Sequence, residues 1–216
     1  MTGYDFPLAG ARLTAFGSGA LWWAEHRLLC VSDLHLGKSE RHARRGGSAL
    51  PPYETQDTLT RLAELVASLQ PQTVVCLGDS FDDDAASQAL PDAEKSQLTA
   101  LMQNRHWIWI TGNHDPAPAG LGGEQMPALH LAPLTFRHIA APLAKAEISG
   151  HYHPKARLRS TSRPCFLLDR SRLILPAFGT YTGGLRSSDP VLSSLMAADA
   201  LAILTGPQAL AIPMPR

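Results

Sequence analysis

Four short polar clusters hold most of the side chains in this sequence that could do chemistry. They are Asp33-Leu34-His35, Gly78-Asp79-Ser80-Phe81-Asp82, Gly112-Asn113-His114-Asp115 and Gly150-His151-Tyr152-His153. A mixture of carboxylate, imidazole and amide donors suits manganese, iron or zinc better than magnesium alone. A pair of such divalent ions catalyses the cleavage of phosphate esters. The residue types therefore predict a binuclear hydrolase centre.

The spacing within the clusters supports shared ligation. Side chains two residues apart at a strand end point the same way, so Asp33 and His35 can reach one ion. By the same reasoning His151 and His153 can serve one ion or one ion each. Asp79 follows a glycine that leaves room for close backbone approach, and its carboxylate can bridge two cations. Each cluster alone is also typical of a solvated turn, and the four together favour the metal site.

An apolar run precedes each cluster and predicts a buried strand that ends there. The four runs are Leu28–Ser32, Thr73–Leu77, Trp107–Thr111 and Ala146–Ser149. Apolar residues three or four apart predict a helix over Thr55–Leu69, and a second helix is expected at about Asp92–Asn104. This alternation is typical of right-handed βαβ units, whose strand ends gather a ligand site.

Further apolar runs predict strands in both halves of the chain. They are Arg12–Phe16, Ala20–Ala24, Ala128–Leu131, Leu134–His138, Ala156–Arg159, Cys165–Leu168, Arg172–Leu175, Ala202–Leu204 and Ala209–Ile212. Loops are expected over the basic segment Gly37–Leu50 and over Pro116–Pro127, and residues 186–216 are interpreted as a closing hairpin with a Ser-Asp-Pro turn. The pattern predicts an α/β fold of two packed sheets flanked by helices, in a single domain over residues 1–216.

Composition limits the class of protein and of partner. The chain has 216 residues, 44% of them hydrophobic and 18% charged, which is ordinary for a globular protein. Its net charge is zero, so a nucleic-acid partner must be held by a local basic patch or by metal ions. Cys30, Cys76 and Cys165 lack zinc-type spacing and are expected to be free thiols in a reducing compartment. With no signal peptide evident and no long apolar run, we expect a cytoplasmic protein with no membrane partner.

The four clusters, in this order, resemble the signature of the calcineurin-like metallophosphoesterase superfamily. The resemblance implies a four-layer α/β/β/α sandwich with two metal ions at the strand ends. It implies one ion held by Asp33, His35, Asp79 and His153, and a second held by Asp79, Asn113, His151 and one further histidine, with Asp79 bridging. His138 ends its predicted strand at the usual distance before the last cluster, and we prefer it to His130 for that position.

A mechanism follows from such a site. Two cations about 3.5–4 Å apart lower the pKa of a bridging water, hold a phosphate oxygen and stabilise the charge on the phosphoryl group. The resulting hydroxide attacks phosphorus in line with the departing alkoxide. His114, the imidazole of its cluster that is not a ligand, is expected to protonate that alkoxide, with Asp115 orienting it. Asp82 is expected to orient a metal ligand or to close a turn.

Longer stretches resemble one bacterial subfamily, the ligase-associated DNA-damage-response endonucleases of the PdeM type. These stretches include Val31–Lys38, Trp107–Pro116, Ala146–Pro154 and Leu175–Gly184. The resemblance implies a manganese-dependent DNA endonuclease in DNA repair that works beside an ATP-dependent DNA ligase, a helicase and an exonuclease-like protein. We expect it to prefer single-stranded DNA.

Basic side chains after the first cluster offer phosphate contacts, although the same run could be a solvated loop. They are Lys38, Arg41, His42, Arg44 and Arg45. Lys155 offers another contact, and Phe178 and Tyr181 could stack on a base or simply pack at a sheet edge. Two other functions stay open: a phosphodiesterase or phosphatase for a small molecule such as a nucleotide, and a non-catalytic metal-binding scaffold. None of the expected ligands is missing, which favours an enzyme.

Overall fold

The computed structural model of the 216-residue chain describes residues 2–46, 51, 53–113 and 120–216. Its first sheet begins with antiparallel strands joined by short turns and continues with parallel strands, in the order β1-β2-β3-β4-β5-β6-β7. The strands are β1 (Gly3–Leu8), β2 (Ala11–Phe16), β3 (Leu21–Trp23), β4 (Leu28–Val31), β5 (Thr73–Leu77), β6 (His106–Ile110) and β7 (Glu124–Met126). Because β4 to β6 run parallel, the polar clusters that follow them meet at one edge of the sheet.

The second sheet has the order β15-β14-β12-β13-β10-β9-β8, and β11 pairs with β12 to form a hairpin. Its strands are β8 (Ala128–Leu131), β9 (Leu134–Arg137), β10 (Glu147–Ser149), β11 (Lys155–Leu158), β12 (Thr161–Leu168), β13 (Arg172–Ile174), β14 (Leu201–Leu204) and β15 (Leu210–Pro213). Strand β10 is parallel to both of its neighbours, β9 and β13. The segments after β9 and β10 therefore leave this sheet at the same edge.

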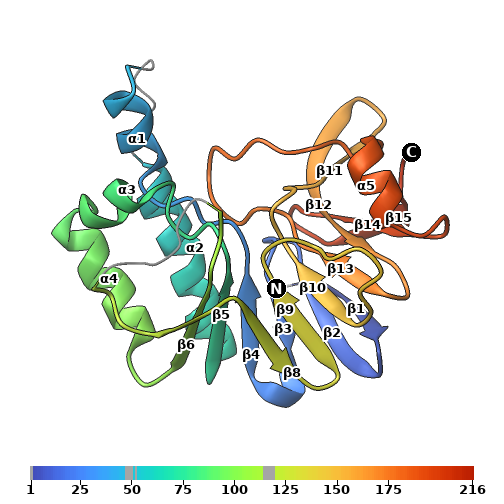
Figure 1. The fold of residues 1–216 in the computed structure, drawn as a ribbon, viewed down its shortest axis with the longest axis horizontal. Coiled ribbons are helices and arrows are strands. Elements are labelled where there is room, and N and C mark those ends of the chain that lie inside the picture. Colours follow the sequence, from blue (N-terminus) through green and yellow to red (C-terminus); the bar gives the residue numbers. More distant parts are fainter. Residues whose placement is uncertain (1, 47–50, 52, 114–119) are drawn as a thin grey trace.

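The sheets and helices are stacked in layers (Figure 1). Three hydrophobic clusters hold these layers together. One lies between the two sheets and includes Leu13 and Phe166. A second joins α2 (Glu54–Leu69) and α4 (Asp92–Met102) to the first sheet, through side chains such as Leu62 and Leu98. The third packs α5 (Pro190–Leu195) on the second sheet through Leu192. These interfaces give the four layers α/β/β/α that the sequence predicts.

Most predicted strands are observed with ends shifted by at most one residue, β12 begins four residues before its predicted range Cys165–Leu168, and three other segments differ more. The basic segment that was expected to be a loop contains helix α1 (Lys38–Arg44). The expected loop over Pro116–Pro127 includes β7, and residues 186–216 include α5 before the β14–β15 hairpin. Strand β1, the short 3-10 helix Ala24–His26 and helix α3 (Asp84–Gln88) were also not predicted.

Helix α1 escapes prediction because polar contacts hold it. Its buried residue is Ser39, whose backbone N–H donates to Glu54 Oε1 at 2.9 Å and whose hydroxyl bonds to the same carboxylate. A helix fixed in this way lacks the apolar periodicity from which helices are predicted.

Two expectations from composition concern the cysteines and membrane-spanning helices. Cys30, Cys76 and Cys165 are buried and form no disulfide among the described residues, and burial raises the pKa of the Cys165 thiol to about 12. Within the described ranges, the helices are too short or too polar to span a bilayer.

Candidate metal centre

Six of the predicted metal ligands form two groups at the edge where strands of both sheets end. The first group is Asp33, His35 and His153, and the second is Asp79, His138 and His151. In each group the candidate ligand atoms all lie within 4.8 Å of one another. The first sheet supplies its ligands from the segments after β4 and β5, and the second sheet from the segments after β9 and β10. We call these groups the first and second triads.

The first triad surrounds a buried carboxylate. His153 Nε2 lies 3.2 Å from Asp33 Oδ1 and 3.4 Å from His35 Nε2. The other oxygen, Asp33 Oδ2, accepts a hydrogen bond of 2.9 Å from the His151 backbone N–H and another from the Ser32 hydroxyl. Asp33 is fully buried, and its Oδ1 faces the His153 ring at 3.2 Å and the His138 ring at 3.9 Å. A carboxylate oxygen in this position is costly unless a cation neutralises it, so the triad fits a metal ion.

The second triad has the same character. His138 Nε2 lies 3.4 Å from Asp79 Oδ2 and 3.2 Å from His151 Nδ1. The Asn113 amide oxygen lies 3.0 Å from the same His138 nitrogen. His138 Nδ1 faces the carbonyl of the last residue of β5 at 3.0 Å, which leaves Nε2 to point into the group. The two triads adjoin, because His138 Nδ1 is also 3.9 Å from Asp33 Oδ1.

The structure gathers six of the seven predicted ligands into these two triads, and the seventh, Asn113, lies against His138 of the second triad. Imidazole nitrogens, carboxylate oxygens and one amide oxygen form a donor set that suits divalent transition metals. His130, the alternative that was not preferred, lies on β8, where its Nδ1 is 3.2 Å from the Thr135 hydroxyl. The assignment of each ligand to an ion, and the bridging role of Asp79, stay predictions.

The backbone at the triads is strained. The φ angles of Asp33, His35, Asp79, His151 and His153 are 52°, 46°, 44°, 73° and 45°. This left-handed region is uncommon for residues other than glycine and costs of order 1–3 kcal/mol each time, and such residues cluster at functional sites. The N–H groups of Asp33 and His35 donate to carbonyls in the loop after β5 at 3.2 and 3.0 Å, which holds the strained segment in place.

Two glycines of the motifs allow close approach between segments. A Cβ atom at Gly78, where φ is +75°, would lie 2.1 Å from His138 Nδ1. A Cβ atom at Gly150 would lie 1.8 Å from Ser32 Oγ and 2.6 Å from Asp33 Oδ2. Each glycine therefore makes room for a candidate ligand that comes from a different strand.

Charges within the centre shift its titration. Burial alone would raise the pKa of Asp33, but the hydrogen bond from His153 and the charges of His153 and His138 hold that pKa below its usual value. Burial lowers the pKa of His138, and the bond to Asp79 with the charges of Asp33 and Asp79 raises it further than burial lowers it. The pKa of His151 is lowered by burial and by the charge of His138. The site is therefore electrostatically prepared for positive charge.

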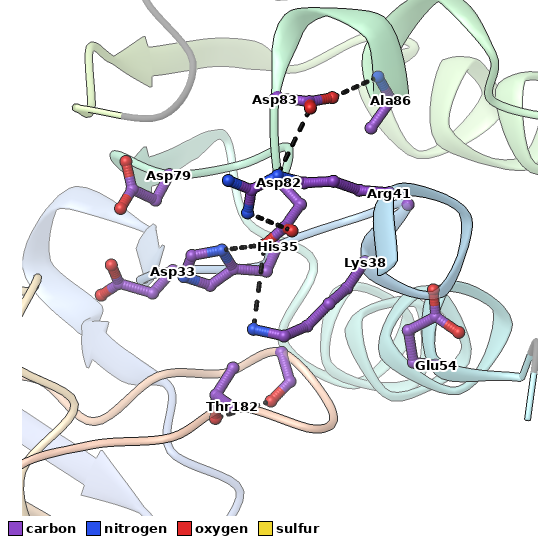
Figure 2. A network of polar contacts seen from close by, with 12 residues as sticks. Asp33, His35, Lys38, Arg41, Glu54, Asp79, Asp82, Asp83, Ala86 and Thr182 are labelled. Carbon is purple, nitrogen blue, oxygen red and sulfur yellow. Dashed lines mark hydrogen bonds and ion pairs between the residues drawn. The ribbon is translucent and has the colours of Figure 1, made fainter. Parts of the chain in front are cut away.

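Asp82 connects the first triad to helix α1 (Figure 2). His35 Nδ1 lies 2.9 Å from Asp82 Oδ1, and Arg41 donates to Asp82 Oδ2 at 2.7 Å. Burial would raise the pKa of Asp82, but the hydrogen bonds from His35 and Arg41 and the charge of Lys38 hold that pKa well below its usual range. An ionised Asp82 keeps the proton of His35 on Nδ1 and leaves Nε2 to face the triad. This arrangement corresponds to the ligand-orienting alternative that the sequence offers for Asp82.

The phosphate-contact residues predicted after the first cluster lie on α1 and at its end, and most of them pair with carboxylates. Arg41 also lies 3.3 Å from Asp83 Oδ2, and Arg44 pairs with Glu40 at 3.0 Å and with Asp83 at 2.9 Å. The third arginine, Arg45, caps the C-terminus of α1 and is exposed. The structure brings Lys38 within 3.8 Å of Asp82 Oδ1. Their role in substrate binding stays a prediction.

The remaining candidates are the predicted general acid, its orienting aspartate and the two aromatic residues that could stack on a base. His114 and Asp115 lie outside the described residues. Phe178 is buried in the cluster between the first sheet and its helices, with the Arg61 guanidinium 4.7 Å from its ring centre, so it packs. Tyr181 is 43% exposed. Sequence reasoning missed Ser32, which binds Asp33 through its hydroxyl, because a serine inside an apolar run gives no signal of its own.

Comparisons with known proteins identify a family and structures to which this chain is similar. The family described as calcineurin-like phosphoesterase matches residues 26–168. Among solved structures, the nuclease MPE of Pseudomonas putida is 26% identical with a TM-score of 0.78, over 98% of this chain and 100% of that chain. Yfce, a phosphoesterase from E. coli, is 15% identical with a TM-score of 0.44, over 87% of this chain and 99% of that chain. A comparison with curated proteins found no match.

Proposed function

We propose that this chain, which belongs to the calcineurin-like phosphoesterase family, is a manganese-dependent endonuclease that cuts single-stranded DNA in DNA repair. The observation that carries the proposal is the pair of adjoining triads. Two neighbouring groups of nitrogen and oxygen donors are what phosphoester cleavage by two divalent cations requires. Membership of the family and the two His/Asp sites together make the protein a metal-dependent phosphoesterase.

The choice of substrate rests on similarity. The likeness to the Pseudomonas putida nuclease MPE extends over 98% of this chain, and it supports a nucleic-acid substrate over a smaller ester. The reaction class is argued from the site itself, since a fold can host several substrates. Manganese is proposed because it accepts both imidazole and carboxylate ligands. An ATP-dependent DNA ligase, a helicase and an exonuclease-like protein stay the proposed protein partners, on the subfamily resemblance alone.

The residues of the chain would hold and orient the metal ions. Bound divalent cations would supply Lewis acidity and activate water for attack on phosphorus. In our proposal the first triad together with Asp79 would hold one ion, and the second triad with Asn113 would hold the other, so Asp79 would serve both. Asp82 keeps the proton of His35 on Nδ1, and a backbone carbonyl faces His138 Nδ1, so both rings offer Nε2 to the ions.

Departure of the alkoxide requires a proton. His114 directly follows Asn113 in the sequence, and Asn113 reaches the second triad. We propose that His114 gives its proton to the departing oxygen and that Asp115 orients the imidazole. The products are then a phosphomonoester and a free hydroxyl, one on each side of the cut.

An assay with three substrates tests the function. Purified protein with manganese is given circular single-stranded DNA, a dinucleotide ester and para-nitrophenyl phosphate, with EDTA and a His151→Ala variant as controls. We expect the circle to be cut by the wild type with manganese and by neither control. Hydrolysis of the small esters alone would favour a small-molecule phosphoesterase. Metal binding without any hydrolysis would favour a scaffold.

A further inference from the structure

A cationic cavity lies along the β11–β12 hairpin, whose first residue, Lys155, follows His153 of the first triad by two positions. It has a volume of about 250 Å³. The basic and hydroxyl side chains that line it include Lys155, Arg157, Arg186, Ser160, Ser162 and Ser188. In Figure 1 the hairpin and helix α1 both rise at the upper end of the view, α1 on the left and the hairpin on the right.

Backbone contacts fix this cavity next to the candidate metal ligand His153. Lys155 follows His153 by two residues, so their Cα atoms are at most about 7 Å apart. The Lys155 N–H donates to the Leu185 carbonyl at 2.8 Å, and the Ser187 N–H donates to the Lys155 carbonyl at 2.7 Å. Arg186 lies between Leu185 and Ser187, and its backbone forms an isolated parallel β-bridge with that of Lys155. A Cβ atom at Gly184 would lie 2.0 Å from the His153 carbonyl oxygen, so the segment before Arg186 packs closely against the backbone of His153.

The hairpin presents its polar side chains on one face. Lys155 and Arg157 are two residues apart in β11, so they point to the same side of the strand. Ser162 of β12 lies directly opposite Arg157 and therefore shares that side. Arg157 and Arg186 are exposed to solvent, and Lys155 is half-buried with its ammonium 3.2 Å from the Thr182 carbonyl.

Among the residues that the structure describes, no carboxylate pairs with the cations of the cavity. Residues 148–168 contain Lys155, Arg157, Arg159 and Arg163 and no aspartate or glutamate, although the whole chain has zero net charge. In the part of the chain that the structure describes, Lys155, Arg157 and Arg186 form no ion pair with a carboxylate. The arginines of α1 differ, since Arg41 and Arg44 pair with Asp82 and Asp83 at 2.7 and 2.9 Å. Lys155, Arg157 and Arg186 are therefore available to attract an external anion.

We infer that this cavity binds the backbone phosphates of a nucleic-acid strand beside the phosphate that is cut. Arginine, lysine and hydroxyl side chains are the usual protein ligands of nucleic-acid phosphates, and such contacts set the register of the strand. With the scissile phosphate at the triads, a strand that continues past His153 reaches the hairpin cations next. The inference rests on the proposed function and adds where the strand runs.

The test compares a double variant, Arg157→Ala with Arg186→Ala, with the control Arg170→Ala. Both cavity arginines are exposed, so the double variant should fold. Arg170 is also an exposed arginine, 3.4 Å from Asp199, and it follows the far end of β12, roughly 20 Å or more from the hairpin turn. Binding of a single-stranded oligonucleotide is measured in EDTA over a range of salt concentrations. Turnover of bis(para-nitrophenyl) phosphate with manganese is measured in parallel.

We expect the double variant to bind the oligonucleotide about tenfold more weakly at low salt. The slope of log affinity against log salt should fall by about 1.4, because each lost phosphate contact on a single strand contributes about 0.7. Turnover of the small ester and affinity for a mononucleotide should match the wild type. Arg170→Ala should match the wild type in every measurement.

The inference is overturned if the double variant keeps the affinity and salt slope of the wild type for single strands. It is also overturned if the variant loses small-ester turnover or mononucleotide affinity in the same proportion, because the cavity would then act on the metal centre or bind a free phosphate ester. A wild type that hydrolyses the small ester but neither binds nor cuts DNA would refute the proposed nuclease function as well. Equal DNA cleavage by the wild type and the double variant would refute the role of the cavity in binding the strand but leave the proposed nuclease function standing.

Discussion

The contact between Asp82 and His35 leads to a prediction about one metal ion of the pair. Both oxygens of Asp82 accept hydrogen bonds, Oδ1 from His35 at 2.9 Å and Oδ2 from Arg41 at 2.7 Å. An Asp82→Asn substitution replaces one of these acceptors by an NH2 group, which must then face a donor on His35 or on Arg41. The negative charge that favours the Nδ1–H form of His35 is lost at the same time.

The size of the effect follows from burial. The Asp82 side chain is only 4% exposed, so water cannot replace the lost acceptor. Loss of such an outer partner of a metal-ligating histidine typically costs about 10- to 100-fold in metal affinity. At about 1.4 kcal/mol for each factor of ten, this corresponds to about 1.4–2.8 kcal/mol. The loss should fall on the ion of the first triad, because the contacts of His138 do not involve Asp82.

Calorimetric titration with manganese measures this effect as two binding steps, of which only one should weaken. The matched control is Asp83→Asn, which removes the same charge one residue away and does not touch His35. Asparagine can still cap helix α3, as the Asp83 side chain does by accepting from the Ala86 N–H at 2.8 Å. The reasoning is refuted if Asp82→Asn binds both ions as the wild type does, or if Asp83→Asn weakens the same step equally.

Three further predictions concern the rest of the centre. Gly78→Ala should weaken manganese binding at the second triad in the calorimetric titration, because the new Cβ would lie 2.1 Å from His138 Nδ1. The control Gly46→Ala, at the same φ of +75° but with no atom near the new Cβ, should leave both binding steps unchanged, and equal effects of the two substitutions would argue against the clash. Manganese affinity should rise as the pH rises through the raised pKa of His138, because the ion binds only the neutral imidazole. Measuring the affinity between pH 5 and 8 checks this, and an affinity that does not change with pH would contradict it. His114→Ala should keep both metal ions but lose most turnover of DNA, by about 100-fold or more for a general acid, and a variant with full activity would remove His114 from the mechanism.

Four strands of the fold, β4, β5, β6 and β10, were predictable because each is an apolar run that ends in a polar cluster, and most other strands because they are apolar runs. Strands β5 and β8 match their predicted ranges, Thr73–Leu77 and Ala128–Leu131, without a shift. Helix α5 was missed although its signal is present: Asp189 accepts a hydrogen bond from the Val191 N–H, and Pro190 begins the helix. The same Ser-Asp-Pro sequence also suits a turn, and the short apolar stretch that follows did not separate the two.

The site was predictable where local motifs carry it and not where tertiary contacts do. Spacing two residues apart brings Asp33 and His35 together, and strand-end positions bring in Asp79 and the histidines. The pairing of Arg41 with Asp82 joins residues 41 positions apart, and it was invisible from the sequence, where the arginine was expected to face solvent or substrate. The open charge of the β11–β12 hairpin is likewise a property of the fold, because it depends on which carboxylates lie near each cation.

Anomalous scattering from a crystal of the manganese-loaded protein addresses the binuclear centre most directly. We predict two manganese peaks per chain, one within reach of Asp33, His35 and His153 and the other within reach of Asp79, His138 and His151. A single peak, or peaks away from these six side chains, would contradict the account.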